Sequence, residues 1–495
     1  MTRVAPRWRP NGAIGADRLR RLCRNRGLPS RRDLSPRRRG NARAAAGGHT
    51  SVLSLHRLVL VATLVGALGA PLPAMAGGAP RLLRDAEIEN DIRAMASPVL
   101  RAAGLEPGDV GIYLVDDSQL NSFVAGGQAI FINTGLILRA ELPNQLIGVI
   151  AHETGHSAGG HVLRAKEAMR NASIETIIAM VAAAAASVVA RSGAPMLGAS
   201  GVGERSFLQF SIAQEATADH AALNFLDRSC QSARGLLKFF EILQGNELLS
   251  GDRQEAWVRT HPLTQQRVQY MRDHVEQARC SNAPDPPGSV ELLRRVKAKL
   301  HAYLDDQSKT LAAYPESDRS PLARYARAIA YYRIPKLDRA LPEIDGLIRD
   351  FPNDPYYREL KGQMLFENGR VRDAIHPYED AIRLAPSAAL LRMSLSQVYI
   401  ESGEPALNKR AIAYLNDVSR SEGRDSQVWH FLAIAYGRDN QLGMAALSLA
   451  EEALANGKKK DAMQQAMRAK QSLAKNTPPY SRAEDIHREA EHLDE

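Results

Sequence analysis

The chain has 495 residues, of which 44% are hydrophobic and 24% charged. This length is enough for about three domains, and this composition disfavours bulk disorder, collagen and a polytopic membrane protein. Three cysteines exclude a disulfide-dense scaffold. The formal net charge of +9 alone would suggest a nucleic-acid or anionic-membrane partner.

The positive charge is concentrated at the N-terminus. Residues 1–50 contain fourteen arginines and only two acids, whereas residues 77–495 carry 49 bases and 53 acids, a net charge of −4. We interpret 1–50 as an Arg-rich leader that results from a mis-called translation start. An RNA-binding arm and an organelle transit peptide are the alternatives. The rest of the chain gives no reason to expect a nucleic-acid partner.

Residues 51–76 have the order of a secretory signal peptide. A basic start at Arg57 precedes an apolar run from Leu58 to Leu72, and Ala74-Met75-Ala76 forms a cleavage site. A membrane anchor is the competing interpretation, but the run is shorter than the ~20 residues that span hydrocarbon. We therefore expect cleavage after Ala76 and an exported protein.

Residues 77–280 combine helical and β-type patterns. Apolar periodicity and composition predict helices over residues 84–105, 142–163, 207–226 and 233–243. Apolar runs between glycines predict strands over 110–115 and 129–133. We expect the strand over 129–133 to pair with an extended substrate by β-augmentation.

The apolar segment 177–190 has fourteen uninterrupted residues, too few to span a membrane. We interpret it as a buried helix or a lid, with peripheral membrane contact as the alternative.

The second half of the chain contains a repeat. The Pro-rich stretch 281–289 is the clearest linker, and residues 290–495 are helical in composition. Small, aromatic and proline positions recur with a spacing of 34 residues, which is the tetratricopeptide period. We expect four helical hairpins that recruit a protein or peptide, against an unrelated helical bundle as the alternative. The spacing holds for Ala328, Tyr331, Ala340 and Pro352 against Gly362, Leu365, Ala374 and Pro386.

His152-Glu153-Thr154-Gly155-His156 is an H-E-x-x-H motif in a segment predicted to be helical. Histidines at i and i+4 share one helical face and can converge on one Zn²⁺ ion, with Glu153 as general base. The apolar residues ahead of the motif disfavour a chance match on a solvated helix.

A later E-x-x-x-D pattern offers the third ligand. A histidine six residues after His156 would complete a different zinc motif, but His161 is only five residues away. Glu215 is therefore the predicted third ligand, and Asp219, one turn later, can accept an N–H from a ligating imidazole. An ordinary pair of helix acids is the alternative, which the alanines around the pair disfavour.

These motifs, with Thr260-His261-Pro262-Leu263-Thr264 and Arg267 after them, resemble the zinc metallopeptidase family that includes the prenyl-protein CAAX endopeptidase and bacterial heat-shock membrane proteases. The resemblance implies an α+β zincin-like peptidase domain over 77–280, followed here by an all-α tetratricopeptide-repeat solenoid. It implies His152, His156 and Glu215 as ligands of one Zn²⁺ per chain. It also implies Glu153 as the base, and His261, assisted by Arg267, as a fourth ligand at rest or a transition-state stabiliser.

The function expected from these features is an exported zinc endopeptidase that acts on unfolded or misassembled envelope proteins. Outer-membrane protein quality control in the periplasm of a Gram-negative-type bacterium, with the outer-membrane assembly machinery as a partner of the repeats, is what the resemblance implies. The alternative is a chaperone or adaptor with a latent or structural zinc site. Export also permits a structural disulfide between Cys230 and Cys280.

Overall fold

The computed structural model describes residues 81–125, 128–161, 177–178, 212–247 and 256–491. The Arg-rich leader, the predicted signal peptide and all of 177–190 except Ile177 and Ile178 lie outside these residues. Within the described ranges, no helix combines the length and apolar character needed to cross a bilayer.

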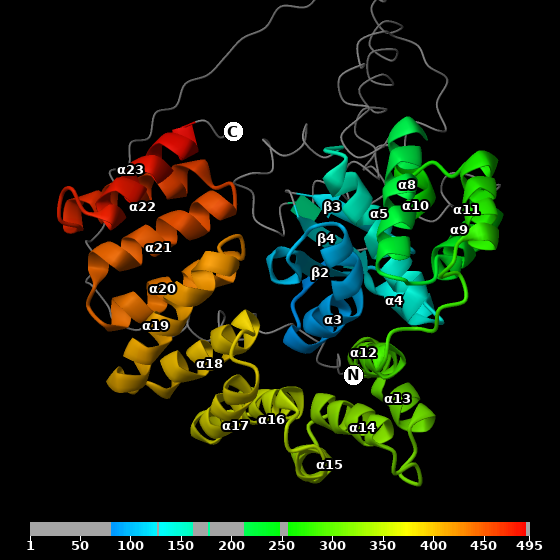
Figure 1. Ribbon diagram of the computed structural model, residues 1–495. Helices are drawn as coiled ribbons and strands as arrows, with labels where there is room; N and C mark the ends of the chain where they lie inside the picture. The colour runs from blue at the N-terminus through cyan, green and yellow to red at the C-terminus, as the bar shows by residue number, and fades with distance from the viewer. Residues whose placement is uncertain (1–80, 126–127, 162–176, 179–211, 248–255, 492–495) are drawn as a thin grey trace, which may run out of the picture. The chain divides into compact units, whose positions relative to one another are not determined.

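A small mixed sheet forms the centre of the N-terminal half, in the order β1-β2-β4-β3 (Figure 1). β2 and β4 are parallel, and β1 and β3 pair antiparallel with β2 and β4 respectively. Strands were predicted at β2 and β4, whereas β1 and β3 are too short to give a periodic signal. The four strands are β1 (Arg81–Leu83), β2 (Gly111–Asp116), β3 (Ser122–Ala125) and β4 (Ala129–Asn133).

The position of β4 corrects one expectation. β4 pairs with β2 along one edge and with β3 along the other, so its backbone hydrogen bonds are used within the sheet and it cannot add an extended substrate. β3 is the outer strand at this end of the described sheet.

Both faces of the sheet are covered, which explains why its strands are continuous apolar runs in the sequence. Side chains alternate between the faces along each strand. Ile112, Leu114, Ile130 and Ile132 join the main core of the half, beneath α3 and α5. Tyr113, Val115 and Phe131 face the other side and pack with Ile177 and Ile178.

The helices of the N-terminal half begin at local capping signals. Asp85 caps α3 by accepting a hydrogen bond from the Ile88 amide at 2.9 Å, and Pro143 occupies the first turn of α5, where its missing N–H costs nothing. The helices are α3 (Ala86–Ala102), α4 (Thr134–Arg139), α5 (Pro143–Ala158), α8 (Ile212–Arg228), α9 (Arg234–Glu247), α10 (Ala256–Thr260) and α11 (Gln265–Gln277), with a 3-10 turn η2 (Pro107–Asp109).

The first helix after the predicted linker is shared by the two halves. In α12 (Ser289–Leu304), Leu293, Val296 and Leu300 belong to the core of the N-terminal half, whereas Tyr303 packs with the first repeat helices. The chain turns at the predicted linker, residues 281–289, but the packing of buried side chains continues from one half to the other.

After α12 the chain is entirely helical within the described residues, as the repeat predicted (Figure 1). Ala328 and Ala340, one on each helix of the first pair, are fully buried. A Cβ added at Gly362 would lie 2.6 Å from the Tyr378 ring, so the close approach of α16 and α17 requires glycine there. The small residues of the period thus lie where paired helices touch.

The helices after α12 include one pair more than the four predicted hairpins, α22 with α23. In α19, three residues more than in α15 or α17 accommodate the break in the 34-residue period before Ala411. The helices are α13 (Gln307–Ala313), α14 (Pro321–Arg333), α15 (Leu337–Asp350), α16 (Pro355–Glu367), α17 (Val371–Leu384), α18 (Ala389–Ser402), α19 (Pro405–Ser421), α20 (Ser426–Arg438), α21 (Leu442–Ala455), α22 (Lys459–Ser472) and α23 (Pro478–Glu491).

A buried arginine links the two halves. The guanidinium of Arg84 donates to Glu89 at 2.9 Å in the N-terminal half and to Glu422 and Asp425 in the repeats, at 2.9 Å and 2.8 Å. It also lies over the ring of Tyr113. One cation therefore compensates three carboxylates that are largely removed from water.

A second group of buried charges lies beside it. Lys299 and Arg295 on α12 pair with Glu87 at the start of α3, and Tyr325 of α14 donates to the same carboxylate. Asp91, one turn further along α3, is 7% exposed, and its Oδ2 lacks a hydrogen-bond partner within the described residues. Burial, with the charge of Glu87, raises the pKa of Asp91 to about 8.

Removing the Arg84 guanidinium should destabilise the protein strongly. We expect Arg84→Ala to lower the free energy of unfolding by about 3–5 kcal/mol, because three buried carboxylates lose their counter-ion. Arg81→Ala is the matched control, since Arg81 pairs with Asp116 at the exposed edge and should cost less than about 1 kcal/mol. Urea unfolding measures both variants, and equal losses would contradict the prediction.

Asp91→Asn should change the pH dependence of stability. Between the ordinary pKa of 3.8 and the folded value of about 8, folded Asp91 keeps a proton that the unfolded chain has lost, so stability falls as pH rises. Asparagine cannot ionise. The free energy of unfolding of the variant should therefore rise relative to that of the wild type from pH 4 to pH 8, by at most about 1.4 kcal/mol per pH unit. Urea unfolding from pH 4 to pH 9 tests this, with exposed Asp109→Asn as control; a pH-independent difference for Asp91→Asn would refute it.

Candidate metal centre

The H-E-x-x-H motif lies on α5 and the E-x-x-x-D motif on α8, and the two helices pack closely. A Cβ added at Gly155 would lie 2.6 Å from the carbonyl oxygen of Ala218. The glycine within the first motif and the alanine within the second therefore let the two backbones approach. This packing brings the predicted ligands of both helices to one point.

Four buried side chains converge there. His152, His156, Glu215 and His261 are each 0% exposed, and one ligand atom from each lies within 4.8 Å of all the others. The Nε2 atoms of His152 and His156 are 3.1 Å apart, and the Glu215 carboxylate oxygens lie 3.4 Å and 3.3 Å from them. The structure thus brings together all the residues that the sequence predicted as ligands.

The separations among the ligand atoms of His152, His156 and Glu215 are close to those around a tetrahedral metal. Ligand atoms about 2.0–2.2 Å from one zinc ion lie roughly 3.3–3.6 Å from one another at the tetrahedral angle. The set of imidazole nitrogens and a carboxylate is typical of catalytic zinc sites and poorly suited to the oxygen-seeking Ca²⁺ and Mg²⁺.

Asp219 and Arg267 support the cluster from behind. Asp219 lies 2.9 Å from His152 Nδ1, on the side of the ring away from the other ligands. Arg267 donates two hydrogen bonds to Asp219, at 2.6 Å and 2.9 Å, and lies 2.9 Å from Glu215. It also donates to the Pro262 carbonyl at 2.7 Å. The guanidinium is thus directed at acceptors that orient the ligands.

His261 reaches the cluster from the turn after α10. Its ring stacks on the ring of Trp257, with centroids 4.1 Å apart, and its Nδ1 lies 2.8 Å from the Thr260 hydroxyl. Its Nε2 faces the cluster, 3.8 Å from Glu153. Sequence reasoning missed Trp257, although a tryptophan four residues before the histidine was a usable signal.

Glu153 is fully buried, and neither of its carboxylate oxygens has a hydrogen-bond partner in the described part of the chain. Burial raises the pKa of Glu153 to about 8, against the opposing influence of His152 and of the Val124 backbone on β3. A buried carboxyl without a hydrogen bond is costly, so its presence beside the ligand cluster indicates a chemical use.

The pKa values of the neighbouring Glu215 and His156 are lowered, whereas that of Glu153 is raised. Burial favours the neutral acid at Glu215, but the nearby imidazoles, His261 first, hold its pKa well below the usual range. Burial lowers the pKa of His156 to about 4. Glu153 and Glu215, two carboxyls in one site, therefore have pKa values pushed in opposite directions, which is the pattern of acid–base sites.

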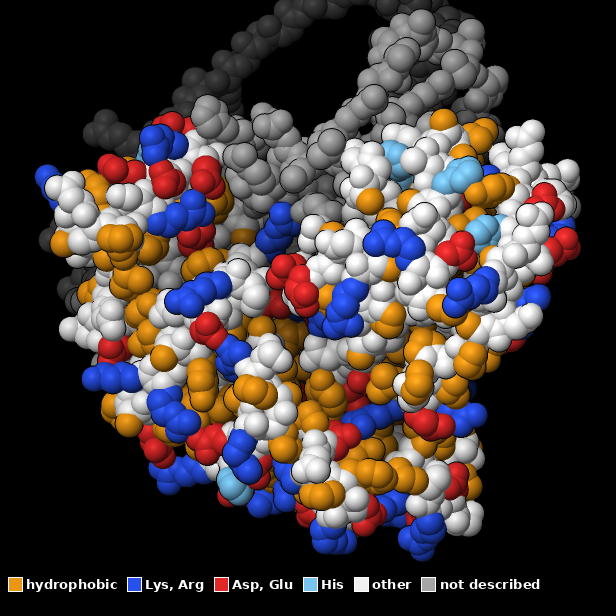
Figure 2. All heavy atoms as spheres, viewed as in Figure 1, with side chains coloured by type: hydrophobic (Ala, Val, Ile, Leu, Met, Phe, Trp, Pro, Cys, Tyr) orange, Lys and Arg blue, Asp and Glu red, His pale blue; other side chains and the backbone are white. Residues whose placement is uncertain are grey.

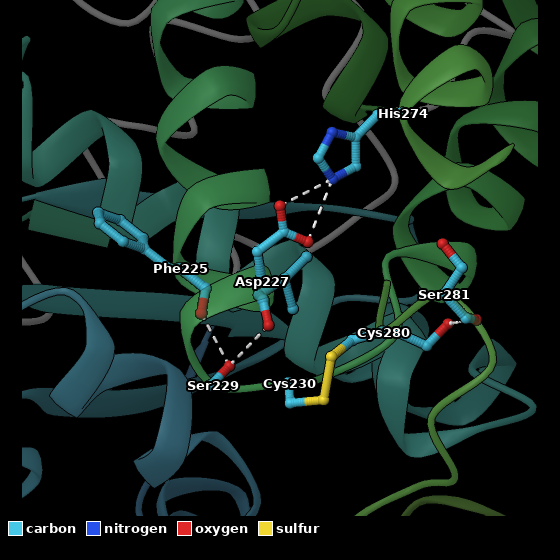
Figure 3. Close-up of a disulfide and its surroundings, with 9 residues drawn as sticks. Phe225, Asp227, Ser229, Cys230, His274, Cys280 and Ser281 are labelled. Atoms are coloured by element: carbon cyan, nitrogen blue, oxygen red, sulfur yellow. Dashed lines mark hydrogen bonds and ion pairs between the residues drawn. A yellow bond between two sulfur atoms is a disulfide. The ribbon is translucent and has the colours of Figure 1, made fainter. Parts of the chain in front are cut away.

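Cys230 and Cys280 form a disulfide between the end of α8 and the turn after α11, with Cα atoms 5.2 Å apart. Figure 3 shows the pair beside a second link between the same helices, Asp227 with His274 at 3.2 Å. The helices that carry Glu215 and Arg267 are thus joined covalently at one end.

Comparisons with known proteins agree with this geometry. Residues 83–275 match the sequence model of peptidase family M48, and residues 325–389 and 359–408 match a tetratricopeptide repeat. The chain is 24% identical to the beta-barrel assembly-enhancing protease of Escherichia coli O157:H7, over 75% of this chain and 77% of the relative. The protein of the same name from Yersinia pestis is 23% identical to the chain, over 68% of this chain and 71% of the relative. Metalloprotease LoiP of Escherichia coli K12 is 32% identical over 34% of this chain and 64% of the relative.

The chain therefore carries an M48 peptidase domain followed by tetratricopeptide repeats, and it is a metalloendopeptidase. The expected fold class is confirmed: an α+β peptidase region with a small mixed sheet, followed by an all-helical repeat array. The comparisons support the M48 family without supporting the resemblance to the CAAX endopeptidase or a finer assignment within the family.

Proposed function

We propose that the chain is an exported zinc endopeptidase of the periplasm that cleaves unfolded or misassembled envelope proteins. The peptidase domain spans residues 77–280 and the repeat domain 290–495, with α12 packed against both. The observation that carries the proposal is the buried cluster of His152, His156 and Glu215, with the fully buried Glu153 carboxyl beside it.

His152, His156 and Glu215 would hold the zinc ion, one per chain. A zinc ion there acidifies water and polarises a peptide carbonyl. Glu153 accepts a proton from the attacking water and passes it to the leaving amine. Burial raises the pKa of the Glu153 carboxyl, which brings it closer to neutral pH and favours a group that both takes and gives a proton.

Asp219 accepts the Nδ1–H of His152 and so fixes which ring nitrogen faces the metal. Arg267 orients Asp219 and Glu215. Because its donors are directed at Asp219, Glu215 and the Pro262 carbonyl, we assign it a positioning role in place of the transition-state role that the resemblance implied.

His261 would take the fourth position around a bound zinc ion at rest. Its Nε2 belongs to the cluster of ligand atoms, and its stacking on Trp257 holds the ring there. A resting His261 in that position would leave no open site for a substrate carbonyl, and the wild-type enzyme would be partly latent. Stabilisation of the transition state by His261 is the alternative.

The substrate strand pairs with β3, which takes over the role expected of β4. β3 is the outer strand of the described sheet, and its Val124 backbone lies near Glu153. Strand pairing of this kind uses hydrogen bonds of the substrate backbone and does not depend on its sequence, and it requires an extended chain. Unfolded or misassembled proteins supply such chains.

The repeats recruit a protein, and the names of the relatives suggest beta-barrel assembly as the setting, for which we propose the outer membrane. On the face in Figure 2, basic and acidic side chains are interspersed over both halves, which agrees with the net charge of −4 over 77–495 and favours no nucleic acid. The predicted signal peptide and the Cys230–Cys280 disulfide support an oxidising compartment outside the cytoplasm.

Glu153→Gln should abolish most cleavage of a reduced, unfolded protein substrate. We expect kcat to fall about 10²–10⁴-fold, the usual range for losing a general base, while bound zinc stays at one per chain. Chelation should remove wild-type activity, and added zinc should restore it. Glu141→Gln, at an exposed carboxylate paired with Lys238, is the control and should behave as wild type.

Equal cleavage by the wild type and Glu153→Gln would refute the enzymatic mechanism. Zinc binding and client binding without any cleavage would instead support the adaptor alternative.

His261→Ala should raise cleavage of the same substrate if His261 blocks the fourth position. The expected gain is several-fold in kcat/KM, with zinc still bound by the remaining three residues. A loss of activity at unchanged zinc content would contradict the latent state and favour transition-state stabilisation.

A further inference from the structure

His156 has a partner on each of its two ring nitrogens. Its Nε2 faces His152 at 3.1 Å and Glu215 at 3.3 Å, within the metal cluster. Its Nδ1 lies 3.0 Å from Nδ1 of His161. His152 has the same arrangement, but its Nδ1 partner is the Asp219 carboxylate at 2.9 Å.

The end of α5 explains how His161 reaches this position. The His161 amide donates to the His156 carbonyl at 3.1 Å, and the Gly160 amide donates to the Ser157 carbonyl at 3.2 Å. With Gly160 at φ +67°, these two bonds form a Schellman motif, which turns the chain back over the last helical turn. The residue that follows such a glycine lies next to the one five positions earlier, here His156.

The turn also fixes the ring. A Cβ added at Gly159 would lie 2.6 Å from His161 Nε2, so the imidazole lies directly over the Gly159 backbone. Gly159 itself has φ −73°, which any residue adopts. The glycine is therefore needed for the ring above it and not for the backbone conformation.

When one ring nitrogen of a histidine binds a metal, the other ring nitrogen carries the hydrogen. If Nε2 of His156 binds the metal with its lone pair, Nδ1 carries the hydrogen and needs an acceptor. The acceptor that faces it is the Nδ1 lone pair of His161. His161 must then be neutral, with its own hydrogen on Nε2.

We propose that His161 is a positioning residue for the zinc ligand His156. It accepts the Nδ1–H of His156 and so orients that ring, as Asp219 orients the ring of His152. The inference deepens the proposed function and rests on it. It also explains the five-residue spacing: the histidine that is one residue too early to be a third ligand is correctly placed to orient the second.

The test is zinc affinity of the full chain, measured by competition with a fluorescent chelator. We expect His161→Ala to weaken zinc binding about 10–100-fold, the usual effect of losing such a partner. His161→Asn should restore much of the affinity, because its side-chain oxygen can take the place of Nδ1. Gly159→Ala should weaken binding while leaving His161 in the sequence, because the added methyl displaces the ring.

Two further measurements separate positioning from a general structural role. His301→Ala removes a partly exposed histidine that contacts Asp305, and it should leave zinc affinity unchanged. Substitution with Co²⁺ gives a visible spectrum that reports ligand geometry, and we expect His161→Ala to shift it while the melting temperature of the metal-free protein stays within a few degrees.

Wild-type affinity in His161→Ala would overturn the positioning role. An Asn variant as weak as the Ala variant would overturn the assignment of the Nδ1 lone pair as the acceptor. A wild-type chain that binds no zinc would overturn the proposed function, and the role of His161 with it.

Discussion

The buried charge network between α5, α8 and α11 is the constraint on which the site depends. Glu215 and Asp219 are removed from water, and each needs compensation that the solvent cannot supply. Arg267 supplies the positive charge from α11, and the imidazoles of α5 lie 2.9–3.4 Å from the same carboxylates. Because a carboxylate left alone in such a place costs several kcal/mol, these pairs favour the arrangement of the three helices that also forms the ligand cluster.

The remaining features of the N-terminal half hold these helices in register. Gly155 allows α5 and α8 to touch, and the disulfide with the Asp227–His274 pair joins the far ends of α8 and α11. The cross-link closes a loop of about fifty residues, which restricts the unfolded chain and stabilises the fold. The geometry of the ligands therefore follows from packing set at some distance from them.

The parts of this arrangement that local spacing determines could be predicted from the sequence. Residues i and i+4 share a helical face, so both histidines of the first motif and both acids of the second were identified. The 34-residue period located the paired helices, and uninterrupted apolar runs located β2 and β4. Each of these signals lies within one helix, one strand or one repeat of the chain.

The parts that depend on contacts between distant segments could not be predicted in this way. Nothing in the order of residues says that β4 is enclosed by β2 and β3, or that Arg267 is directed at Asp219 and not at the open side of the metal. The same holds for α12, whose composition is that of any repeat helix although three of its leucine and valine side chains complete the core of the other half. His161 is intermediate, because the two glycines before it signal a turn but not what the turn brings together.

The sharing of α12 bears on how the two halves act together. A repeat array joined by a flexible linker would present a client to the peptidase at many orientations, whereas here buried ion pairs from Arg84, Arg295 and Lys299 connect the first strand and helix of the peptidase to the repeats. Buried pairs of this kind are costly to open, because each separated charge would need to be hydrated again. The repeat helices that pack on α12 are therefore fixed against the peptidase half. Under the proposed function, a protein bound to the repeats would meet the peptidase from one direction, and the choice of cleavage site would depend on where along that protein the repeats bind.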